Sequence, residues 1–177
     1  MATLVQTVIG DDRSGLVNAI AGAIADHGGN WEQSHMSHLA GKFAGIVLVE
    51  VPDSRADALV AALDAIDEEG LLEITRSVVA DELQDAPAAA ATVEIVGQDR
   101  PGIVHDISSE FAARGVSIAQ LETSTTSAPM GGGMLFEAVV RLQVPADVSL
   151  DELRQSLEAL ANELMVDIDF SQGPAAG

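Results

Sequence analysis

The chain has 177 residues, of which 47% are hydrophobic and only 3% aromatic, so we expect one domain or two small ones with an aliphatic core. Asp and Glu number 28 against 8 Lys and Arg, and a net charge of -20 disfavours direct binding of nucleic acid, whose phosphates attract cationic partners, so we expect none. Cysteine is absent, which excludes disulfides and thiolate chemistry. Neither a signal peptide nor an apolar run long enough to cross a bilayer is recognisable, so we expect a cytoplasmic protein with no membrane partner.

A repeated segment divides the chain into two copies. Val8–Val17 reads VIGDDRSGLV and Ile95–Val104 reads IVGQDRPGIV, an offset of 87 residues. Phe43–Pro52 matches Phe136–Pro145 at an offset of 93, because residues 128–133 lengthen a turn in the second copy. Separate matching blocks with one gap at a turn predict two tandem units of one fold.

Six elements are predicted in the first copy. Residues 3–9 form a strand, and Leu16, Ile20 and Ile24 have the spacing of a helix that ends at His27 before two glycines. A hairpin, a helix with Ser54 at its N-cap and a closing strand follow, and the three strands cover residues 31–39, 42–51 and 72–79. Apolar residues at every position of 46–49 favour a third strand that is covered on both faces.

The second copy repeats this order. Its first helix ends at Gly115, its hairpin covers 116–127 and 134–144, and its last strand covers 165–170. Ser149 and Glu152 have the spacing of a capping box at the start of its second helix. Polar residues alternate with apolar ones in 136–144, which predicts a sheet with one covered face.

The order β-α-β-β-α-β is that of the ferredoxin-like unit. We therefore expect an α+β fold of two such units in tandem, each an antiparallel sheet with its helices on one face. The predicted domains are 1–82 and 92–172, joined by a linker at 83–91 and followed by a loose tail at 173–177.

The turn between the first strand and first helix of each copy carries the candidate chemistry. Asp12-Arg13-Ser14-Gly15 and Asp99-Arg100-Pro101-Gly102 place a glycine and backbone N–H groups at a helix start, where a carboxylate can bind. The same residues also fit a purely structural role, in which Asp caps the helix and Gly permits the turn. Spacing leaves both interpretations open.

Other patterns give no catalytic or cofactor site. Gly97 and Gly102 have P-loop spacing, but Ile103 and Val104 follow where Lys and Ser or Thr are required. His35 and His38, three apart on a strand, point to opposite faces and cannot chelate one metal. With neither a nucleophile triad nor facing carboxylates recognisable, we expect a protein that is not an enzyme and has no metal or cofactor.

The Asp-Arg-Pro-Gly turn, the entry to the second strand after Gly28 and Gly115, and the order of elements resemble tandem ACT-domain proteins. Within that family the chain is most similar to the group of the glycine cleavage system transcriptional repressor. The resemblance covers roughly residues 3–80 and 92–171. It implies two regulatory units that bind small amino acids and pair side by side, within or between chains.

The resemblance also implies where the ligand binds, namely between the first turn of one unit and the start of the second strand of a paired unit. Ser14 departs from the family proline, and Ser117 from a frequent asparagine. Transferred position by position, the implied ligand-binding residues are Asp12, Arg13, Gly15, Leu16 and Asn30 in the first copy, and Asp99, Arg100, Gly102, Ile103 and Ser117 in the second.

Two functional hypotheses follow. The first is a non-enzymatic, dimeric regulator that senses a small amino acid and modulates a partner protein in the transcriptional control of amino-acid metabolism, with glycine metabolism as the specific case. The second is a structural module for dimerisation or protein docking, whose turns bind no ligand.

Overall fold

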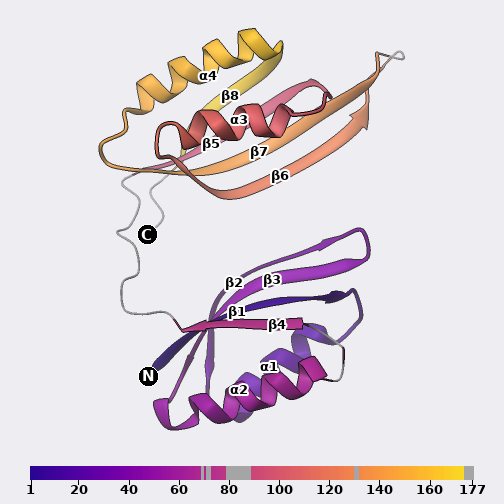
Figure 1. Ribbon diagram of the computed structural model, residues 1–177, viewed down its shortest axis with the longest axis vertical. Coiled ribbons are helices and arrows are strands. Elements are labelled where there is room, and N and C mark those ends of the chain that lie inside the picture. Colours follow the sequence, from indigo (N-terminus) through magenta and orange to yellow (C-terminus); the bar gives the residue numbers. More distant parts are fainter. Residues whose placement is uncertain (69, 71–72, 79–88, 130–131, 174–177) are drawn as a thin grey trace. The chain divides into compact units, whose positions relative to one another are not determined.

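The computed structural model describes residues 1–68, 70, 73–78, 89–129 and 132–173. The chain divides into two compact units, Met1–Gln84 and Asp85–Gly177 (Figure 1). Each unit has its own sheet and its own core, so each is described by itself.

The first unit is a four-stranded antiparallel sheet in the order β2-β3-β1-β4. Both of its helices lie on one face of the sheet (Figure 1). Its elements in chain order are β1 (Ala2–Asp11), α1 (Leu16–Asp26), β2 (Asn30–Leu39), β3 (Lys42–Val51), α2 (Asp53–Glu68) and β4 (Glu73–Val78).

The second unit repeats this topology as β6-β7-β5-β8, again with both helices on one face (Figure 1). The predicted α+β fold of two ferredoxin-like units is confirmed. Its elements are β5 (Ala89–Gln98), α3 (Ile103–Ala112), β6 (Ser117–Ser127), β7 (Met134–Val144), α4 (Leu150–Leu164) and β8 (Val166–Gly173).

The predicted domain limits differ from these elements by a few residues. Strand β5 begins at Ala89, so the last three residues of the predicted linker pair with β7 and β8. Gly173 pairs with Ala90 and belongs to β8 rather than to the predicted tail. The remaining linker residues, 83–88, and the tail residues 174–177 lie outside the described residues.

Each core consists of aliphatic side chains between the sheet and its helices. In the first unit Leu4 and Val8 of β1 pack against α1 and α2 residues such as Ile20 and Leu63. Between them lies Gln6, which is fully buried and whose Oε1 and Nε2 have no hydrogen-bond partner among the described residues. The equivalent position in the second core is Val93, so one copy has a polar side chain where the other is apolar.

The helix starts rule out one open alternative and correct one prediction. Neither Asp12 nor Asp99 caps a helix, since the N-caps are Gly15 and Gly102, with φ of 95° and 88° and no side-chain cap. This left-handed conformation favours glycine, which has no Cβ. The helix α2 begins at Asp53, because its first turn already forms at Pro52, and Ser54 therefore lies inside it rather than at its N-cap.

The cap predicted at the second copy's last helix is confirmed. Ser149 is the N-cap residue of α4, and its Oγ accepts a hydrogen bond from the Glu152 N–H at 3.3 Å.

In each unit no described element covers the sheet face opposite the helices (Figure 1). Ile46 is 52% exposed there, so the prediction of a β3 covered on both faces is wrong within the unit. Alternation in β7 is as predicted, with Phe136 and Val140 buried and Glu137 exposed.

The two open faces differ in charge. We call the centre of the first the neutral face; strand register brings together on it Val5, Thr7, Ile9, Ala44, Ile46 and Leu48, while Glu50 and Glu73 lie beside them on the same side of the sheet. We call the second the acidic face; its carboxylates are Glu94, Glu122, Glu137, Asp167 and Asp169.

Candidate ligand site at the first turn

The turn between β1 and α1 is held in place from both sides. The Asp12 N–H donates to the Gly41 carbonyl at 2.9 Å, which ties the turn to the β2–β3 hairpin. On the other side Leu16 is buried in the core and fixes the first residue of α1. Gly15, between them, leaves the helix N-terminus without a side-chain cap. The first backbone N–H groups of α1 therefore donate to no capping side chain.

A hollow of about 580 Å³ opens at this turn. Four of the five residues that the sequence predicts for the first site line it, which is what a ligand site at this turn requires. The lining consists of Asp12, Arg13, Gly15, Leu16, Val17, Asn18, Ala21 and Phe43.

The fifth predicted residue, Asn30, lies elsewhere. It pairs with Glu50, which in turn pairs with Thr3 near the start of β1, whereas the turn follows the end of β1. At about 3.4 Å per residue this separation along the strand is roughly 27 Å. A single ligand contacts both places only if Asn30 comes from another unit, as the resemblance implies.

Opposite charges surround the first turn. Lys42 contacts Asp11 through a short hydrogen bond, and this contact holds the pKa of the Asp11 carboxyl below its usual value. His38 Nε2 lies 3.5 Å from Asp12 Oδ2. Arg13 Nη2 lies 3.9 Å from Asp11 Oδ2, a distance too long for a hydrogen bond. The side chains of Asp12 and Arg13 are both about half exposed and accessible to a ligand.

This arrangement matches the two charges of a free amino acid. Arg13 and the start of α1 can bind a carboxylate, since a guanidinium and a helix N-terminus both attract anions. Asp12 can accept hydrogen bonds from an ammonium group.

The second turn has the same backbone but different contacts. The Asp99 N–H donates to the Met134 carbonyl at 2.8 Å, as Asp12 does to Gly41. Arg100 Nη2, however, donates to Asp106 Oδ2 at 2.6 Å. Ile103 is buried, as Leu16 is, and Gly102 is the N-cap.

As with Asn30, Ser117 lies away from the turn of its own unit. It pairs with Gln143, and Gln143 pairs with Ala90 at the start of β5, whereas the turn follows Gln98 at the end of that strand. The structure therefore brings together the turn residues of each copy but not the second-strand residue.

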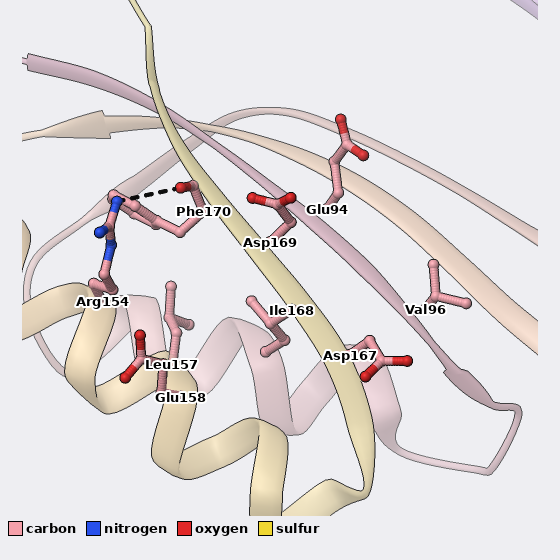
Figure 2. Close-up of a pocket in the computed structure, with 9 residues that line it drawn as sticks. All are labelled: Glu94, Val96, Arg154, Leu157, Glu158, Asp167, Ile168, Asp169 and Phe170. Carbon is pink, nitrogen blue, oxygen red and sulfur yellow. Dashed lines mark hydrogen bonds between the residues drawn. The ribbon is translucent and has the colours of Figure 1, made fainter.

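A second hollow, of about 520 Å³, is lined by residues of α4, of the edge strand β8 and of β5 (Figure 2). Arg154 Nη2 donates to the Phe170 carbonyl at 3.4 Å, and its guanidinium lies 5.2 Å from the Phe170 ring centre. Four carboxylates share the hollow with this one cation, so it disfavours anions. The lining consists of Glu94, Val96, Arg154, Leu157, Glu158, Asp167, Ile168, Asp169 and Phe170.

Sequence reasoning did not find this second hollow. The only sequence signal is the alternation of Asp167 and Asp169 in β8, which is equally typical of a solvated strand face. Among the described residues, no group of three or more His, Asp or Glu side chains could hold a metal ion. The helices that the structure describes include none with the length and apolarity to span a membrane.

Comparison with known proteins places both units in one family. ACT-domain models match residues 2–75 and residues 91–162. The glycine cleavage system transcriptional repressor of Escherichia coli is 26% identical over 162 residues, which are 91% of this chain and 85% of the repressor. A UPF0237 protein of Methanopyrus kandleri is 35% identical over 79 residues, covering 44% of this chain and 81% of its own. The crystal structure of an unknown protein from Galdieria sulphuraria superposes with a TM-score of 0.85 and 28% identity, covering 98% of this chain and 99% of that one.

Proposed function

Because the chain belongs to the ACT-domain family, with two of these regulatory domains in tandem, we propose that it is a cytoplasmic sensor of a small amino acid that modulates a partner protein. The observation that carries this proposal is the hollow at the first turn, which is lined by Asp12, Arg13 and the start of α1. These groups complement the ammonium and carboxylate of a zwitterion, whereas the hollow beside β8 has four carboxylates against the single cation Arg154.

The similarity to the repressor of Escherichia coli supports a role in the transcriptional control of glycine metabolism. The net charge of -20 disfavours contact with DNA. We therefore propose that any effect on transcription passes through a protein partner, which binds DNA itself.

Thermal unfolding against the twenty amino acids tests the ligand proposal. A ligand at one hundred times its Kd stabilises the protein by about 2.7 kcal/mol. For a unit of this size we expect the transition to rise by roughly 11–22 °C. Arg13→Ala should abolish this rise, whereas Arg55→Ala, which removes an exposed arginine from α2, should leave it unchanged. If no amino acid raises the transition of the wild-type protein, the proposed sensing function is wrong.

The neutral face favours a second candidate function, a docking module. Ile9 and Ile46 are 45% and 52% exposed on it, an arrangement that favours burial against another surface. Ile46→Lys should then lower the association state measured by sedimentation. Val139→Lys, at the equivalent position of the acidic face, is the matched control. Loss of association without any amino-acid response in the wild type would favour docking over sensing.

A further inference from the structure

The two turns are alike in sequence but differ in what their arginines contact. The pair of Arg100 and Asp106 is closed at 2.6 Å, and both side chains are less than two-fifths exposed. Arg13 has Asp11 at 3.9 Å and is 55% exposed. Arg13 therefore keeps its N–H donors for an external anion, whereas Arg100 already uses one on a carboxylate of its own unit.

One position in the helix accounts for this difference. The N–H of Asp106 donates to the Gly102 carbonyl at 3.0 Å, and the N–H of Ala19 donates to the Gly15 carbonyl at 2.9 Å. Asp106 and Ala19 are thus equivalent positions, one turn into α3 and α1. The first turn of α3 contains Asp106, whereas that of α1 contains no acidic residue. A carboxylate at this end of a helix is favoured by the helix dipole, as a ligand carboxylate would be.

From this difference we infer that Asp106 occupies the anion position of the second turn, so that only the first turn binds a free amino acid. The inference rests on the proposed function and names the residue that decides which copy responds. A ligand carboxylate at the second turn would have to displace Asp106 from Arg100 and approach a like charge. Repulsion between unit charges about 4 Å apart near a protein surface weakens binding by at least about tenfold.

Exchanging the two helix residues tests the inference in the full chain. Asp106→Ala should open the second turn, and Ala19→Asp should close the first. Ala19→Asn has the same shape as the aspartate without its charge, so it controls for steric effects. The amide resonances of Gly15 and Gly102, followed by NMR while each of the twenty amino acids is added, report separately on the two turns.

In the wild type we expect an amino acid to shift the amide resonance of Gly15 and not that of Gly102. Asp106→Ala should add a shift of the Gly102 resonance. Ala19→Asp should weaken the affinity measured from the Gly15 shift by at least about tenfold, whereas the affinity of Ala19→Asn should stay within about threefold of wild type. Asp106→Asn replaces the alanine variant if that variant does not give the spectrum of a folded protein.

The remaining outcomes separate this inference from the proposed function. Equal responses at Gly15 and Gly102 in the wild type would overturn the inference and leave the sensing function standing. A response at neither glycine in the wild type would overturn the sensing function, and a response at Gly102 that appears only in Asp106→Ala would still support the role of Asp106. A response at neither glycine in any variant would overturn both.

Discussion

Replacing Gln6 by leucine should stabilise the first unit. Its amide is fully buried on the helix side of β1, and neither polar atom has a partner among the described residues. Leaving a buried polar group without a hydrogen bond costs about 1–3 kcal/mol. Leucine has a similar volume and no polar atoms, so it removes this cost without opening a cavity.

We expect Gln6→Leu to raise the free energy of unfolding by about 2 kcal/mol, a shift of roughly 10 °C for a unit of this size. Differential scanning calorimetry of the full chain measures this shift. Val93→Gln is the reciprocal change, because Val93 is the equivalent core position of the second unit. It should lower stability by a similar or larger amount.

A neutral or destabilising Gln6→Leu would refute this reasoning. It would mean that the amide has a hydrogen-bond partner in the native protein. Urea unfolding provides an independent check, because a true change in stability moves the midpoint and leaves the slope unchanged.

Two further predictions concern a helix cap and an ion pair. Ser149→Ala should lower the free energy of unfolding in urea by about 1 kcal/mol, because it removes the acceptor of the Glu152 N–H. Ser54→Ala, which lies inside a helix, should lower it clearly less. Because Lys42 lowers the pKa of Asp11 in the folded state, the ion pair contributes stability above the ordinary pKa of 3.8 that is lost as the pH falls below it. Lys42→Met should therefore reduce the stability difference between pH 6 and pH 3, and an unchanged difference would show that the pair contributes nothing.

The fold was predictable because its signals are local and occur twice. Glycines end the first helices and aliphatic residues follow helical spacing, so element order emerged from sequence alone. Capping by Asp12 and Asp99 stayed an open alternative because Asp is a common capping type, and only the left-handed φ at Gly15 and Gly102 shows that glycine occupies that position.

The inequality of the two turns could not be predicted from their shared motif. Asp106 lies six residues beyond Arg100, and sequence does not tell whether the arginine side chain turns toward it or toward solvent. Gln6 was likewise inconspicuous, because one polar residue in a β-rich run is equally typical of an exposed position. Both features depend on side-chain direction, which periodicity constrains only to one face.

The separation of the turn from the second-strand start in each sheet has a thermodynamic consequence. A ligand that contacts both of these places must bridge two units. Its binding free energy is therefore added to the free energy of their association. By mass action, such a ligand promotes pairing, and pairing raises the apparent affinity for the ligand by the same factor. The concentration of the chain itself would then set the amino-acid level at which it responds whenever the paired units belong to different molecules.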